Sequence, residues 1–183
     1  MTRSSVIIPG RLFGPYQPLL FYAAMAVRAR GGEVERIDWN AAESLDEAAS
    51  SEVRHDWVLD QVTPVLDRLG GRPVLIGKSL ATYAADLAAQ RGLPAIWYTP
   101  LLLDERVVAS LRASTAPFLL IGGTADTAAW DGALARSLTP YVCEIPDANH
   151  GLMVPAGLAA SAGVLGEVTT ATERFLDEVV WPA

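Results

Sequence analysis

A serine at position 79 stands between a short apolar run and an Ala-rich helical pattern. The run 74–77 is typical of a buried strand and the residues after 79 are typical of a helix, so Ser79 falls on the turn between them. Gly77 and Ala81 lie two residues before and two residues after this serine. Small residues there let the strand and helix backbones nearly touch. The spacing predicts a sharp turn that presents a serine hydroxyl above the carboxyl end of its strand.

A serine hydroxyl becomes a good nucleophile only when a base takes its proton and a third group orients that base. Asp126 follows the apolar run 117–121, and His150 follows the apolar run 141–145. In a parallel sheet, residues that follow strands gather at the same edge. We therefore expect Ser79 as nucleophile, His150 as base and Asp126 as the group that orients it.

Each of these residues has a simpler interpretation. Ser79 could cap a helix, Asp126 could cap the helix expected at 128–137, and His150 could bond only to backbone. Asp104 and Asp131 are alternative acids, and Asp104 follows the strand expected at 94–100.

The chain order Ser, Asp, His and the turn Gly77-Lys78-Ser79-Leu80-Ala81 resemble the α/β-hydrolase family, with Ala81 in place of the second glycine of its motif. The segments 122–126 and 147–151 resemble that family's acid and histidine loops. The resemblance extends over nearly the whole chain. It implies a three-layer α/β fold that lacks the family's first two strands and a lid domain.

The resemblance also implies where the oxyanion of a tetrahedral intermediate would be bound. One donor is the backbone N–H of Leu80, next after the nucleophile, and the second comes from the loop after the first strand. Arg11 and Leu12 remain alternatives for that second donor. Lys78 needs a partner if it is enclosed. We expect an ion pair with a nearby acid, the alternative being a preference for anionic substrates.

The elements needed to position these residues alternate strictly along the chain. Apolar runs predict strands at 5–8, 34–39, 73–77, 94–100, 117–121 and 141–145, and periodic patterns predict helices at about 18–30, 50–69, 79–91, 104–114, 128–137 and 165–180. Pro64 should kink or divide its helix, and 40–49 should be a loop that enters it. Such alternation predicts one domain, 1–183, with a six-stranded parallel sheet and helices on both faces. The charged strand at 34–39 suits a sheet edge.

The amino-acid composition of the chain argues against some classes of function. The chain has 183 residues, 51% hydrophobic and 19% charged, with a formal net charge of −7. This predicts a globular domain whose surface disfavours nucleic acid and anionic membranes. The short N-terminal apolar run and the single cysteine, Cys143, favour a cytoplasmic protein without disulfides or a cysteine metal cluster. The sequence does not decide whether it forms a homo-oligomer.

These observations predict a serine hydrolase that cleaves a carboxylic ester or thioester of a small substrate through an acyl-enzyme, without metal or cofactor. About 19 residues separate Tyr98 from Phe118, which leaves no room for a lid and predicts a shallow site. Two alternatives are an inactive binding or scaffold protein on the same fold and an acyltransferase.

Overall fold

The centre of the molecule is a six-stranded sheet in which every neighbouring pair of strands is parallel. The computed structural model describes residues 3–39, 45–46 and 48–182. In spatial order the strands are β2 (Glu33–Arg36), β1 (Ser4–Ile8), β3 (Val74–Lys78), β4 (Ala95–Tyr98), β5 (Phe118–Gly123) and β6 (Val142–Ile145). The edge position expected for the charged strand is confirmed, because β2 pairs only with β1.

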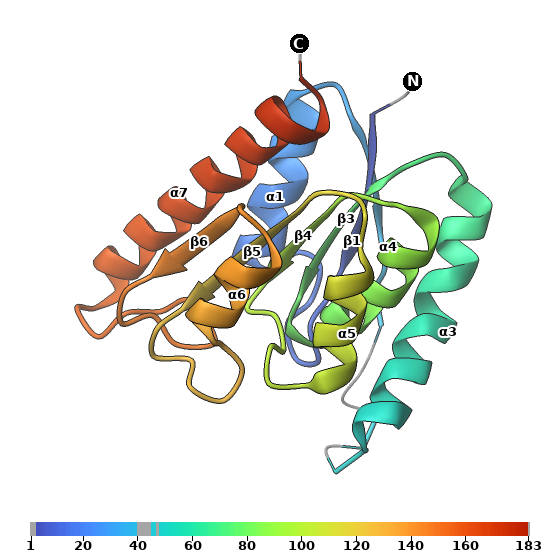
Figure 1. Ribbon diagram of the computed structural model, residues 1–183. Coiled ribbons are helices and arrows are strands. Elements are labelled where there is room, and N and C mark those ends of the chain that lie inside the picture. Colours follow the sequence, from blue (N-terminus) through green and yellow to red (C-terminus); the bar gives the residue numbers. More distant parts are fainter. Residues whose placement is uncertain (1–2, 40–44, 47, 183) are drawn as a thin grey trace.

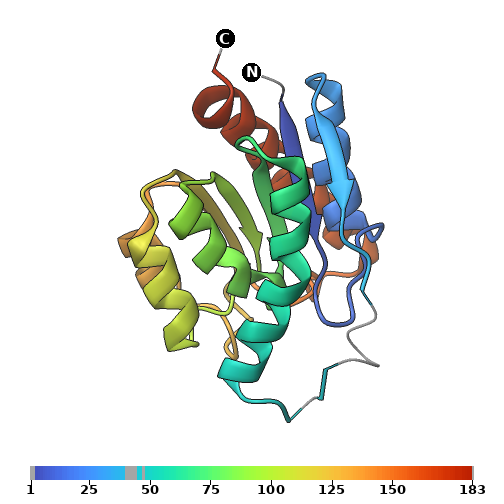
Figure 2. The same ribbon diagram turned by 90° about the vertical axis from the view of Figure 1, so that its right-hand side faces the viewer.

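Helices cover both faces of the sheet, so the expected three-layer architecture is confirmed (Figures 1 and 2). One face carries α1 (Pro18–Ala29) and α7 (Leu158–Phe175), which pack against each other. The other face carries α3 (Ser51–Leu69), α4 (Ala85–Arg91), α5 (Glu105–Ala113) and α6 (Gly132–Leu138). Each face has its own apolar core. No helix in the described part of the chain is long and apolar enough to cross a membrane.

The register of the sheet brings the ends of its central strands into one row. Ile8 pairs with Gly77, and Lys78 pairs with Tyr98. In Figure 1 the loops that follow the strands lie at the bottom, at the end of the molecule opposite both termini. The three loops that carry the candidate catalytic residues therefore open at the same edge.

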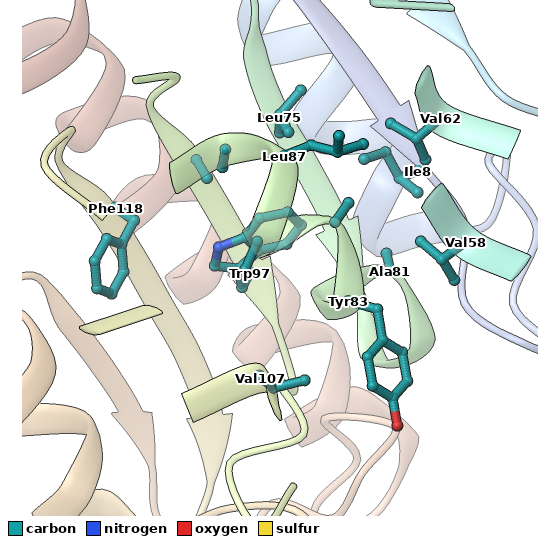
Figure 3. Packing of buried hydrophobic residues seen from close by; sticks show 14 of the residues in the cluster. Ile8, Val58, Val62, Leu75, Ala81, Tyr83, Leu87, Trp97, Val107 and Phe118 are labelled. Atoms are coloured by element: carbon teal, nitrogen blue, oxygen red, sulfur yellow. The ribbon is translucent and has the colours of Figure 1, made fainter. Parts of the chain in front are cut away.

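The core beneath that edge explains why a glycine precedes the serine turn. A Cβ built on Gly77 would lie 2.6 Å from the Ala81 Cβ and 2.9 Å from Trp97 Cζ3, closer than real Cβ atoms approach other atoms. Trp97 fills the centre of the cluster, with Leu75 and Ala81 beside it (Figure 3). Only glycine at position 77 lets strand, helix and indole meet.

Four local expectations were wrong or fall outside what the structure describes. The helix after Ser79 begins as a 3-10 helix, η1 (Ser79–Ala84), before α4 continues it. The last helix begins at Leu158 instead of about 165, with Ser161 and Val164 buried in its first turns, and it ends in a π-helical turn, η2 (Leu176–Val180). Pro64 does not divide its helix, since α3 continues through it, and the expected kink stays a prediction. Most of the loop expected at 40–49 lies outside the described residues.

Candidate active site

Ser79 lies on a sharp turn between β3 and η1, with a φ of 53°. A positive φ is uncommon for a residue with a side chain and is found where the surrounding structure enforces it. Here the closely packed Gly77 and Ala81 hold the strand and helix together on either side. The turn leaves Ser79 partly exposed while the residues beside it are buried.

The structure brings Ser79, His150 and Asp126 into one hydrogen-bonded chain. Ser79 Oγ lies 2.8 Å from His150 Nε2, and His150 Nδ1 lies 2.7 Å from Asp126 Oδ2. The Asp126 side chain is 3% exposed, whereas the His150 side chain is 42% exposed. The carboxylate is therefore held inside the protein, and the imidazole lies where a substrate can reach it.

Gly123 makes the meeting of the acid and histidine loops possible. A Cβ built on Gly123 would lie 2.1 Å from the carbonyl oxygen of Ala148, so only glycine allows this approach. Two hydrogen bonds then join the loops, from the Ala125 N–H to the Ala148 oxygen (3.0 Å) and from the Asp147 N–H to Thr124 Oγ1 (2.8 Å).

The histidine loop is also held by its own side chains. Asn149 Oδ1 accepts hydrogen bonds from the N–H groups of Gly151 (2.8 Å) and Met153 (3.1 Å). The position of His150 is thus fixed from both sides along the chain.

The two alternative acids cap helices and are engaged elsewhere. Asp104 caps α5, and its Oδ2 accepts hydrogen bonds from Ser51 Oγ and Tyr83 Oη, both 2.6 Å long. Burial raises the pKa of Asp104, but these hydrogen bonds and those from the backbone lower it more, so the pKa lies below its usual value. Asp131 caps α6 through the Leu134 N–H.

The loop after β1 lies beside the nucleophile. A Cβ built on Gly10 would be 3.8 Å from the Ser79 Cβ. The Gly10 N–H donates to the Phe13 oxygen (2.9 Å), and the Gly10 oxygen accepts from Trp39 Nε1 (3.3 Å), so the turn is closed and anchored. Among the residues that the structure describes, the backbone N–H of Leu12 forms no hydrogen bond within the chain. Leu80 lies in the first turn of η1, where N–H groups lack intrahelical partners.

Lys78 does not form the ion pair expected from the sequence: within the described ranges, no carboxylate lies within ion-pair distance of its Nζ. Its ammonium donates to Thr99 Oγ1 (3.0 Å) and to the carbonyl oxygen of His150 (2.9 Å). Burial lowers the pKa of Lys78 to about 8, and the charge of Asp126 opposes that effect. The sequence showed that a lysine directly precedes the serine, but it could not show the partners of the ammonium, because these come from distant loops.

Other residues singled out in the sequence have structural roles. Trp97 and Tyr98 are 1% exposed and belong to the two apolar cores. The His55 side chain is 14% exposed, and its two ring nitrogens contact Asp56 and Asp86. Within residues 3–39, 45–46 and 48–182, no cluster of His, Cys, Asp and Glu has the arrangement of a metal site.

No protein-family model matches the sequence, and a search of curated proteins finds no significant match. Solved structures are similar over nearly the whole chain. Est1E from Butyrivibrio proteoclasticus, with ferulic acid bound, is 15% identical with a TM-score of 0.71, covering 98% of this chain and 90% of its own.

Two further structures have the same architecture. An α/β serine hydrolase homologue from Coxiella burnetii is 16% identical with a TM-score of 0.69, covering 96% of this chain and 85% of its own. An α/β serine hydrolase without a lid from Xanthomonas campestris is 18% identical with a TM-score of 0.56, covering 96% and 82%. The chain therefore has the fold of the small α/β-hydrolases.

Proposed function

We propose that this protein is a serine hydrolase that cleaves a carboxylic ester or thioester of a small substrate. The observation that carries the proposal is the continuous chain from Ser79 Oγ through both nitrogens of His150 to the buried Asp126 carboxylate. An acid bonded to Nδ1 keeps the proton on that nitrogen, so Nε2 is free to accept the serine proton.

The first half of the reaction forms an acyl-enzyme. Ser79 Oγ attacks the carbonyl carbon of the substrate as its proton passes to His150 Nε2. Asp126 stabilises the resulting imidazolium. The tetrahedral oxyanion is bound by the backbone N–H of Leu80 and by a second N–H, from Leu12 or Arg11 in the loop after β1. His150 then returns the proton to the leaving oxygen or sulfur as the C–O or C–S bond breaks.

The second half releases the acid. Water attacks the acyl carbon while His150 Nε2 takes its proton, and the proton passes to Ser79 Oγ as the enzyme ester breaks. Between β4 and β5 the chain adds only the short helix α5, so no lid domain is inserted there. Small or exposed acyl groups therefore suit the site best.

A fluorophosphonate probe and a panel of p-nitrophenyl esters and acyl thioesters test this proposal. The wild-type protein should be labelled at Ser79 and should release acid from one class in the panel. Ser79→Ala should abolish both signals with unchanged circular dichroism. Ser110→Ala is a matched control at a partly exposed helical serine outside the site and should keep both signals.

The results separate three kinds of protein. Wild-type turnover in Ser79→Ala would refute the nucleophile. An unlabelled wild-type serine with no turnover would indicate a binding protein. Labelling with product formed only when an alcohol or amine acceptor is added would indicate acyl transfer.

A further inference from the structure

Lys78 is the only lysine in the sequence, and it is buried directly before the candidate nucleophile. It is the last residue of β3 and is 3% exposed. Removing an ammonium from water is unfavourable unless it gains partners in the protein. The thirteen other basic residues are arginines, so a single lysine at this one position suggests a specific role.

The protein supplies partners around the whole Lys78 ammonium. An ammonium has three N–H donors. Two donate to Thr99 Oγ1 and to the His150 carbonyl oxygen, and Nζ lies 5.1 Å from the centroid of the Phe13 ring, a favourable distance for a cation over an aromatic face. The ammonium is thus enclosed by the protein, which argues against the alternative that it binds an anionic substrate.

The partners of Lys78 come from three loops around the serine. Phe13 belongs to the loop after β1, Thr99 follows β4, and His150 follows β6. Thr99 is fully buried with a φ of 43°, a conformation that a β-branched residue adopts only when its surroundings enforce it. One side chain therefore joins the loop of the base to the loop of the proposed oxyanion donor.

We propose that Lys78 is a positioning residue: its ammonium holds His150 by the carbonyl oxygen and supplies a positive charge that acts on the buried Asp126 from beyond ion-pair distance. This inference rests on the proposed hydrolase function. It gives the lysine two duties that depend on its proton. A charged donor makes a hydrogen bond about twice as strong as a neutral one, and only the charged form compensates the carboxylate.

The charge of Lys78 should therefore limit activity at alkaline pH. Asp126, in the loop after β5, is the carboxylate whose charge acts on the ammonium. His150, in the loop after β6, contacts it through its backbone carbonyl oxygen, and Thr99 and Phe13 are uncharged. Arg11 is the cation of the loop after β1. Burial lowers the pKa of Lys78 to about 8. We expect kcat to fall about three- to tenfold as pH rises through this value, with KM changed less than about twofold.

Nuclear magnetic resonance of the single lysine tests the coupling without any substrate. With ¹³C at the lysine Cε, one side-chain resonance should titrate near pH 8. Asp126→Asn should lower that midpoint, because the anion that favours the ammonium is gone. Asp131→Asn makes the same chemical change at a helix cap, where asparagine also caps well, and should leave the midpoint unchanged.

Lys78→Met tests the consequence for activity. It should lower kcat about ten- to a hundredfold at pH 7, with little change in KM, and its kcat should show no alkaline fall. Arg72→Met removes a cation just before the other end of β3, six residues or about 20 Å away, and should keep the wild-type profile. If Lys78→Met does not fold, the lysine titration in the wild type and Asp126→Asn decides.

The outcomes separate this inference from the proposed function. A lysine midpoint near 10.5, an Asp126→Asn midpoint equal to wild type, or an alkaline fall kept in an active Lys78→Met would overturn the positioning role. A coupled lysine in a protein that hydrolyses no ester or thioester would instead overturn the proposed function.

Discussion

Lys78→Met should change the way the stability of the protein depends on pH. The pKa of Lys78 is lowered by burial to about 8, against 10.5 for an accessible lysine. Below pH 8 the ammonium is charged in both folded and unfolded chains, and the folded state bears the full desolvation penalty. As pH rises from 8 towards 10.5, the folded chain loses the proton first, so the free energy of unfolding rises.

The size of this effect follows from the two values. The full difference corresponds to roughly 3 kcal/mol at 1.36 kcal/mol per pH unit, of which about 2 kcal/mol should be present by pH 9.5. Lys78→Met has no proton at this position. The difference in unfolding free energy between wild type and variant should therefore shift by about 2 kcal/mol in favour of wild type between pH 7 and 9.5.

Urea denaturation at both pH values measures this double difference. Burial raises the pKa of Tyr83 to about 12 and of Cys143 to about 11, so both groups stabilise the folded state less as pH rises through their unfolded values. These contributions are present in both proteins and cancel. Equal pH dependence in the two proteins, with equal m values, would refute a lowered pKa at Lys78.

Two other substitutions probe the frame around the site. Asp104→Asn should lower the free energy of unfolding by about 1–2 kcal/mol, because the Asp104 carboxylate accepts two side-chain hydrogen bonds. Its kcat should stay within about threefold of wild type. A variant with no measurable turnover and normal stability would move the acid role to Asp104. Gly77→Ala should lower the free energy of unfolding by about 1–3 kcal/mol and should also lower kcat, because the new Cβ would meet Ala81 and Trp97. The control Gly163→Ala, which has open space around it on helix α7, should be neutral or stabilising. Equal melting temperatures for the two variants would contradict the packing argument.

The order of strands and helices could be predicted from the sequence because each element carries its own local signal. Apolar runs that end at glycine or proline marked five strands, and an alternation of apolar and charged residues marked the sixth, all within a few residues of the observed bounds. The start of α7 was missed because an Ala- and Gly-rich segment has no strong periodicity, although the structure continues the helix back to Leu158. Local patterns identify elements better than they identify where an element begins.

The candidate site, like the fold, could be predicted from the sequence only in part. Residue types, and their places after successive strands, were enough to predict that Ser79, Asp126 and His150 would meet, because parallel strands bring their carboxyl ends to one edge. The choice against Asp104 needed the tertiary structure, since only there is this carboxylate seen to bond Ser51 and Tyr83.

The partners of Lys78 lie beyond any local signal. Its hydrogen-bond partners, Thr99 and His150, are 21 and 72 residues away in the sequence. His150 takes part through its backbone carbonyl, a contact that does not depend on residue type and cannot be predicted from it. The sequence thus determined the order of the elements and the residue types that gather at the candidate site. Only the packing of distant loops decided that a buried cation would be held by a hydroxyl and a carbonyl, because that depends on which atoms the loops bring together.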